Sequence, residues 1–503
     1  MIHAAKLNKI DLLVLIVIVL IGLVHLPFPF DGDQAFFRLG ALEMQQGKLL
    51  YRDFWDVKQP GIFCFYFLAG TLFGFDEIGI HAFELIYMVF FSIILLLTLK
   101  SYFRHQIIAS LVPLLTVGLY YAVSGAWHLT QVEALVGFPL FLCLWLTFQG
   151  FKNEGKQRFI LFLLSGFIGG IVLLFKLIFL LILLSFWLTI LMYSVLIKRQ
   201  GTQKIFIEIC LPIFIGLIFP LLVVASYFAW FNSFEIVYQT FFIYPPLIIA
   251  NSALKQSDFI SGIKWFLQNF YPLVVIAIIA IDASLRKSKN ILTLLLLVWC
   301  IFGLSVIALQ YKALWEYHFL LLFVPIGILA TKGLDVLWDY LKELRSPIPT
   351  ILLIFLLFLP LSSTLAKKSL TLVNNNFALT EDARLKYQTV FRKKYPSLHS
   401  DANFISQPQS LAGEIYVAGD PSIYYFSGRS QATILRGWAL EYFLPEQWLK
   451  LIEQLDSSKP PYIFIDDVRQ AIIKKYFPKI LEFVEQRYRI LHQSNNGIWY
   501  IIK

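Results

Sequence analysis

The sequence predicts a polytopic α-helical membrane protein with about eleven transmembrane helices and a C-terminal extracytoplasmic α/β domain. Three observations support this fold class: long apolar runs, an uneven distribution of Lys and Arg between alternate loops, and an abrupt change of composition near residue 367. Hydrophobic residues make up 58% of the 503 residues and charged residues only 15%, which is more apolar surface than a water-soluble fold can bury. Lipid therefore has to solvate much of the chain.

Eleven apolar runs come close to the roughly 17 to 25 residues that cross a hydrocarbon core. They are 12–28, 80–99, 107–123, 134–151, 159–175, 177–197, 205–230, 265–283, 291–309, 317–331 and 349–366. The first run follows a charged start, as in a signal peptide, but Pro27, Phe28 and Pro29 stand where small residues would precede a cleavage site. We therefore expect an uncleaved first span.

The loops between these runs alternate in charge. One set contains sixteen Lys and Arg, whereas the other set, without the tail, contains only eight in much longer loops. Because short cytoplasmic loops retain positive charge, we expect the basic set and the N-terminus in the cytoplasm. The C-terminal domain is then periplasmic or extracellular, and the chain is a multi-pass protein of the cell (inner) membrane.

The same loops explain the overall charge. Their sixteen cations, less four acidic residues, leave +12, which accounts for the formal net charge of +10. A nucleic-acid partner is therefore not expected. The four cysteines, three of them within predicted spans, do not indicate a disulfide or zinc framework.

We expect two domains: a transmembrane domain over 1–366, which includes the outer loop 29–79, and a soluble extracytoplasmic α/β domain over 367–503. Within the outer loop, 36–44 and 61–73 are amphipathic or apolar. Such segments suit short helices that lie in the membrane interface.

The tail after residue 366 shows the pattern of a small α/β domain. Residues 414–418 and 462–465 are typical of buried strands, and 487–492 with 498–502 of a hairpin. Helices are expected over 380–394, 445–455 and 468–476.

Ionisable residues in or beside apolar runs are costly to place, so their positions are informative. Most of them fall at the predicted outer ends of the spans, where a bundle could bring them into one pocket. A carboxylate there could act as a general base, and cations could hold a phosphate group. Alternatively, each charge only marks a helix end in the headgroup zone, and a lysine at a hairpin turn could snorkel. The candidates are Asp31, Asp33, Lys58, His128, Glu133, Lys176, Lys312, Glu316 and His318.

The motif Asp31-Gly32-Asp33 directly follows the first span. Its carboxylates could belong to a structural turn, could include a catalytic base, or could bind a metal ion. The sequence leaves these three interpretations open, and with them a divalent cation as cofactor.

A series of motifs follows the chain in order. The outer loop contains Asp33-Gln34, Ala41, Gly47, Tyr51-Arg52-Asp53 and Lys58-Gln59-Pro60. Further along are Glu133, the glycine-rich stretch 166–170 ending at Lys176, Glu316-Tyr317-His318-Phe319 with Pro325, and 415–420 with Tyr424 and Gly428-Arg429. In order and placement they resemble the GT-C superfamily of membrane glycosyltransferases, in particular the branch of protein O-mannosyltransferases and the lipid A aminoarabinose transferase.

The resemblance implies a polyprenyl-phosphate-linked sugar as donor, a hexose or pentose, and a lipid, glycan or protein as acceptor on the outer face. Our mechanistic hypothesis is an inverting glycosyltransferase with Asp33 as general base. Lys58, with Lys176 or Lys312, would hold the departing lipid phosphate. The other candidates would bind substrate, with His318 and Glu133 orienting the donor or the cations. The family's Asp-Glu pair is Asp33-Gln34 here, so acceptor and cofactor are not carried over.

Two other classes of function fit a helix bundle. A transporter or flippase of lipid-linked sugars would line a pathway with its buried charges, and a non-catalytic assembly subunit would use the tail for docking. The grouping of charges on one side and the large outer domain favour the transferase.

Overall fold

The computed structural model describes residues 6–251, 259–287, 290–311, 314–343 and 362–503. The chain divides into two compact units. Unit 1 comprises Met1–Leu26, His81–Val224 and Gln256–Val373, and unit 2 comprises Pro27–Ile80, Ala225–Lys255 and Asn374–Lys503. The outer loop, which the sequence assigned to the transmembrane domain, thus folds in the same unit as the C-terminal residues.

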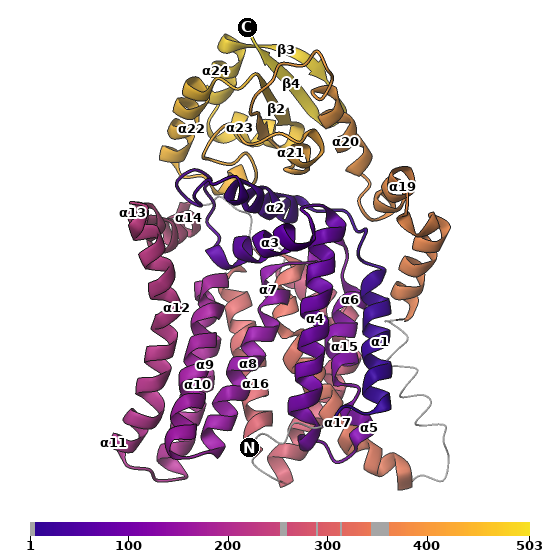
Figure 1. Cartoon of the computed structure of the whole chain (residues 1–503), viewed down its shortest axis with the longest axis vertical. Coiled ribbons are helices and arrows are strands. Elements are labelled where there is room, and N and C mark those ends of the chain that lie inside the picture. Colours follow the sequence, from indigo (N-terminus) through magenta and orange to yellow (C-terminus); the bar gives the residue numbers. More distant parts are fainter. Residues whose placement is uncertain (1–5, 252–258, 288–289, 312–313, 344–361) are drawn as a thin grey trace. The chain divides into compact units, whose positions relative to one another are not determined.

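Eight helices in the described part of the chain are long and apolar enough to cross a membrane. They are Glu77–Tyr102, Val132–Lys152, Gly155–Phe175, Leu177–Leu196, Thr202–Trp230, Ile260–Ser284, Ile291–Leu309 and Glu316–Glu343. Each overlaps one of the predicted runs, and the long helices run alongside one another (Figure 1). The chain is therefore a multi-pass α-helical membrane protein.

The remaining three predicted runs explain the difference from eleven. The first run forms α1 (Lys9–Leu23), which has only 15 residues. The third is divided into α5 (Gln106–Ala109), a π-helical turn and α6 (Leu119–Val123), where Pro113 removes one backbone donor from the helical ladder. The eleventh, 349–366, lies mostly outside the described residues, so the number of about eleven is not confirmed.

The helices that lie wholly or partly in unit 1 follow the membrane spans. Besides α1, α5 and α6 they are α4 (Glu77–Leu99), α7 (Val132–Leu135), α8 (Gly137–Lys152), α9 (Gly155–Phe175), α10 (Leu180–Leu196), α11 (Thr202–Ile205), α12 (Leu211–Trp230), α15 (Phe259–Lys287), α16 (Ile291–Leu309), α17 (Phe323–Glu343) and a helix over 362–374. Within the unit, α8 packs on α9, α10 on α16, and α15 on α17.

The glycine-rich helix α9 packs against α12 with almost no space between the backbones. A Cβ atom at Gly166 would lie 2.2 Å from the carbonyl oxygen of Ile213, and one at Gly216 would lie 2.1 Å from that of Leu163. Small residues permit such close approach between helices in lipid, where there is no hydrophobic drive for them to associate. This packing fixes the course of α9, which ends directly before Lys176.

Unit 2 combines short helices with one small sheet. Its helices are α2 (Gly32–Gln45), α3 (Pro60–Phe73), α13 (Phe234–Tyr238), α14 (Tyr244–Asn251), α19 (Glu381–Phe391), α20 (Tyr395–Phe404), α21 (Ser422–Ser427), α22 (Pro445–Ser458), α23 (Asp467–Tyr476) and α24 (Lys479–Arg487). Two of them, α2 and α3, confirm the helices predicted in the outer loop and pack against each other.

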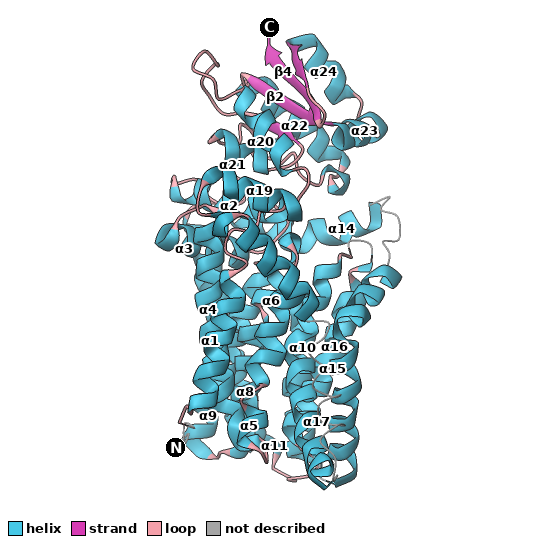
Figure 2. Ribbon diagram, turned by 90° about the vertical axis from the view of Figure 1, so that its right-hand side faces the viewer, coloured by secondary structure: helices cyan, strands magenta, loops and turns pink. Residues whose placement is uncertain are grey.

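The sheet has the strand order β1-β2-β4-β3. Its strands are β1 (Tyr416–Ala418), β2 (Tyr462–Asp466), β3 (Tyr488–Gln493) and β4 (Gly497–Ile502). The first two strands pair in parallel and the others are antiparallel, with β2 and β4 side by side (Figure 2). The predicted C-terminal strands and hairpin are thus confirmed.

Candidate active site

The predicted site residues that the structure brings together form two groups, one in each unit. In unit 2 the central residue is Asp33, in the first turn of α2. The helix begins after Asp31, whose backbone N–H donates a hydrogen bond of 2.7 Å to Oε1 of Gln34. This contact is half of a capping box, and a carboxylate in the first turn is favoured by the helix dipole. Gln34 therefore helps to begin the helix that holds Asp33.

The two oxygens of Asp33 have different partners. Trp438 donates its indole N–H to Oδ1 at 2.9 Å, and the ammonium group of Lys58 lies 3.3 Å from Oδ2. The Asp33 side chain nevertheless keeps 21% of its surface exposed. The carboxylate is therefore held in place while it stays accessible to a small polar group.

Lys58 is positioned by the loop that precedes α3. Its backbone N–H donates to Asp56 at 2.7 Å, and its carbonyl oxygen accepts from the hydroxyl of Tyr51 at 2.7 Å. Its ammonium group lies 4.7 Å from the centre of the Phe37 ring, a cation–π contact. Both ends of this lysine are thus fixed by the outer loop itself.

Electrostatics keep Asp33 ionised. Burial alone would raise the pKa of this carboxyl, but the charge of Lys58 and the hydrogen bond from Trp438 outweigh burial and hold the pKa below its usual value. Arg436 contributes in the same direction. Asp33 therefore carries a negative charge at neutral pH.

Arg436 is buried next to this group and forms an ion pair with Asp56. Burial lowers the pKa of Arg436 to about 10, so the guanidinium stays charged at neutral pH. The backbone N–H of Trp55 donates to the carbonyl of Ile434 at 3.0 Å. The segment before Trp438 therefore runs beside the loop that carries Lys58.

Asp31 has a separate partner. The guanidinium of Arg392 lies 2.9 Å from Asp31 and also pairs with Asp420. Burial raises the pKa of Asp31, although Arg392 opposes this shift. Each carboxylate of the Asp31-Gly32-Asp33 motif is thus engaged by a cation or an N–H group of the chain itself. Within the described ranges, no group of three or more His, Cys, Asp or Glu could hold a metal ion.

In unit 1 the structure brings Glu133, Lys176 and His318 together. Glu133 belongs to α7 and is almost fully buried, and its Oε1 lies 2.8 Å from the Lys176 ammonium group and 3.5 Å from Nε2 of His318. The backbone N–H of Trp315 donates to Nδ1 of His318 at 2.9 Å, which leaves the proton on Nε2, facing Glu133. Lys176 has an extended backbone at the turn between α9 and α10 and keeps 26% of its side chain exposed.

The other candidates do not join these groups. Nδ1 of His128 accepts a hydrogen bond of 3.0 Å from the backbone N–H of Gly125. The imidazole ring stacks on the Trp265 ring, with 4.8 Å between the ring centres. Burial lowers its pKa to about 3, with a further contribution from Lys368. Glu316 is partly buried at the start of a 3₁₀ helix and forms no ion pair with the described residues. Lys312 lies outside the described residues.

Sequence reasoning missed the contribution of the C-terminal residues to the site. Trp438, Arg436 and Arg392 each contact an aspartate of the outer loop. The signal in the sequence is the segment Arg436-Gly437-Trp438, where a cation and an indole flank a glycine in the soluble tail. The partners of these side chains could not be predicted from that segment, because they lie about 400 residues away in the sequence.

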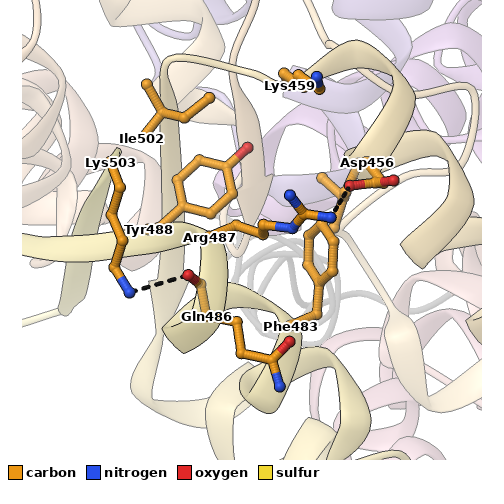
Figure 3. A pocket seen from close by; sticks show the side chains of 9 residues that line it. Asp456, Lys459, Phe483, Gln486, Arg487, Tyr488, Ile502 and Lys503 are labelled. Atoms are coloured by element: carbon orange, nitrogen blue, oxygen red, sulfur yellow. Dashed lines mark hydrogen bonds and ion pairs between the residues drawn. The ribbon is translucent and has the colours of Figure 1, made fainter.

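A surface pocket in the C-terminal part of unit 2 contains none of the predicted site residues (Figure 3). It is lined by Leu455, Asp456, Lys459, Phe483, Gln486, Arg487, Tyr488, Ile502 and Lys503. Arg487 forms an ion pair of 3.3 Å with Asp456, and Lys503 donates to the carbonyl of Gln486 at 2.9 Å. Two of its three cations are thus already engaged.

No protein-family model and no curated protein sequence matches this chain. Its fold matches two crystal structures of ArnT from Cupriavidus metallidurans, in each case over 97% of this chain and 97% of ArnT. The structure with bound undecaprenyl phosphate has a TM-score of 0.61 and 12% sequence identity, and the apo structure has 0.60 and 11%. The GT-C resemblance seen in the sequence is thereby confirmed at the level of fold. The chain therefore has the fold of ArnT.

Proposed function

We propose that this protein transfers a sugar from a polyprenyl-phosphate-linked donor to an acceptor at the outer face of the membrane, with inversion at the anomeric carbon. One observation carries the proposal: a chain with the ArnT fold holds an ionised carboxylate, Asp33, between the cation Lys58 and the indole N–H of Trp438. A base beside a cation is what glycosyl transfer from a lipid phosphate requires. The crystallised ArnT that binds undecaprenyl phosphate supports the same class of donor.

In the proposed reaction Asp33 accepts the proton of an acceptor hydroxyl while that oxygen attacks the anomeric carbon. The bond between this carbon and the phosphate oxygen breaks, and polyprenyl phosphate leaves with the electron pair. The cation Lys58, 3.3 Å from Asp33, stabilises the negative charge that develops on the leaving phosphate. The proton ends on Asp33 and the sugar on the acceptor oxygen, so atoms and charge balance.

The group in unit 1 offers an anchor of its own for an anionic lipid headgroup. Lys176 is partly exposed and can offer its ammonium group to a lipid phosphate, while Glu133 and His318 fix its position. A partly exposed ammonium group that is paired with a buried carboxylate is a suitable anchor for an anionic headgroup.

The test uses purified full-length protein in proteoliposomes with a panel of undecaprenyl-phosphate pentoses and hexoses. Envelope lipids, glycans and proteins serve as acceptors, and release of undecaprenyl phosphate is measured. We expect one donor to release undecaprenyl phosphate in an acceptor-dependent reaction. Movement of labelled donor between leaflets without its consumption would instead identify a flippase and overturn the transferase.

A further inference from the structure

The two oxygens of the Asp33 carboxylate contact different groups. Oδ1 is occupied by a neutral donor, whereas Oδ2 faces the ammonium group of Lys58. A carboxylate held only by Lys58 could rotate and offer both oxygens to it. The indole N–H prevents this, because it fixes the plane of the carboxylate without adding a charge.

Trp438 is itself held firmly. A Cβ atom at Gly32 would lie 2.2 Å from Cζ2 of Trp438, so the indole packs directly on the glycine of the Asp31-Gly32-Asp33 motif. The guanidinium of Arg469 lies 4.3 Å from the centre of the ring. Arg469 is in turn held by Asp466, which accepts its backbone N–H at 2.6 Å and lies 3.4 Å from its guanidinium.

The loop around Trp438 explains why the indole reaches this position. A Cβ atom at Gly437 would lie 1.9 Å from the carbonyl oxygen of Val417, so the loop presses against strand β1. Ala439, the next residue after Trp438, adopts a positive φ of 56°. The side chains on both sides of Gly437 contact the outer loop, Arg436 through Asp56 and Trp438 through Asp33.

We propose that Trp438 is a positioning residue that fixes one oxygen of Asp33, so that Lys58 can leave the other oxygen for the phosphate of the lipid-linked donor. This inference rests on the proposed function. In the free protein Lys58 neutralises Asp33; on donor binding it moves to the phosphate, and the freed Oδ2 becomes the proton acceptor. The C-terminal domain thus completes the site and couples donor binding to activation of the base.

Binding of undecaprenyl phosphate to the full-length protein, measured by native mass spectrometry, tests this without any turnover. In Trp438→Phe the carboxylate loses an N–H donor and depends more strongly on Lys58, so we expect 3- to 10-fold weaker binding. In an Asp33→Asn background Lys58 is already released, so the same Trp438→Phe change should have no effect. Trp448→Phe, a matched change at a buried indole elsewhere in unit 2, should leave binding unchanged in both backgrounds.

The outcomes separate the two proposals. An equal loss of binding from Trp438→Phe in both backgrounds, or no loss in either, would overturn the positioning role. If neither Asp33→Asn nor Lys58→Met changes binding of undecaprenyl phosphate, the proposed donor site itself fails. If these two variants do change the binding of undecaprenyl phosphate, the proposed donor site is supported, whatever the effect of Trp438→Phe.

Discussion

Trp438 donates a hydrogen bond to Asp33 across 405 positions of the sequence. The outer loop after α1 and the C-terminal domain therefore belong to one compact unit, and the candidate site of that unit consists of residues from both. The C-terminal residues are therefore not a separate compact unit. The Trp438 indole, the buried Arg436 and the partly buried Arg392 hold the aspartates of the outer loop.

The first prediction concerns Gly32. In Gly32→Ala the new methyl group would overlap the Trp438 ring, so either the ring or the start of α2 has to move. We expect at least a tenfold loss of transfer activity with normal levels in the membrane. Gly201→Ala adds the same methyl group where no atom lies within 4 Å and should behave as the wild type. A fully active Gly32→Ala would contradict the packing described for Trp438.

A second prediction concerns the buried carboxylate Glu133. Lys176→Met would leave Glu133 without its main cation, and breaking a buried ion pair costs about 3–5 kcal/mol. We expect a clearly lower apparent melting temperature, measured by size-exclusion chromatography after heating. The double variant Lys176→Met with Glu133→Gln should recover most of that stability but not the binding of undecaprenyl phosphate. Recovery of binding in the double variant would show that Lys176 has only a structural role.

His128 provides a prediction on pH dependence. Its pKa in the folded protein is about 3 because of burial and the charge of Lys368, against about 6.5 when unfolded. Below pH 6.5 the unfolded chain therefore binds a proton that the folded chain does not, and stability falls by about 1.4 kcal/mol per pH unit. At pH 5 this amounts to about 2 kcal/mol.

The measurement is the apparent melting temperature between pH 8 and pH 5. His128→Gln should flatten the decline, whereas His492→Gln, at an exposed histidine, should leave it unchanged. A decline of equal slope in the wild type and His128→Gln would show that His128 does not cause the acid sensitivity.

Much of the fold could be predicted from the sequence because lipid imposes simple rules on a chain. Apolar length identified the eight described spans, and the interfacial run 61–73 proved to be helix α3. The exceptions have local causes. Pro113 divides one predicted span. The first predicted span forms a helix of only 15 residues, which ends at Leu23, before the end of the apolar run.

The candidate site could be predicted only in part. Asp33 and Lys58 stand in one loop, and Glu133, Lys176 and His318 all stand at span ends, so residue type and position were sufficient to select them. His128 fits the same pattern, but it is packed against Trp265 instead. Trp438 could not be found, because an indole in a soluble segment is ordinarily part of a core and its partner is set by tertiary folding.

In the proposed function, Asp33 is the base of a transfer from a polyprenyl-phosphate sugar. The most direct measurement is the rate of undecaprenyl phosphate release by Asp33→Asn, with the donor and acceptor that the panel assay identifies. Asp382→Asn, at an exposed carboxylate of α19 paired with Lys386, is the matched control. We predict that Asp33→Asn loses at least 100-fold in rate, consistent with the 10²- to 10⁴-fold contribution of a general base, while the control keeps the wild-type rate. Undiminished release by Asp33→Asn at normal membrane levels would contradict the account.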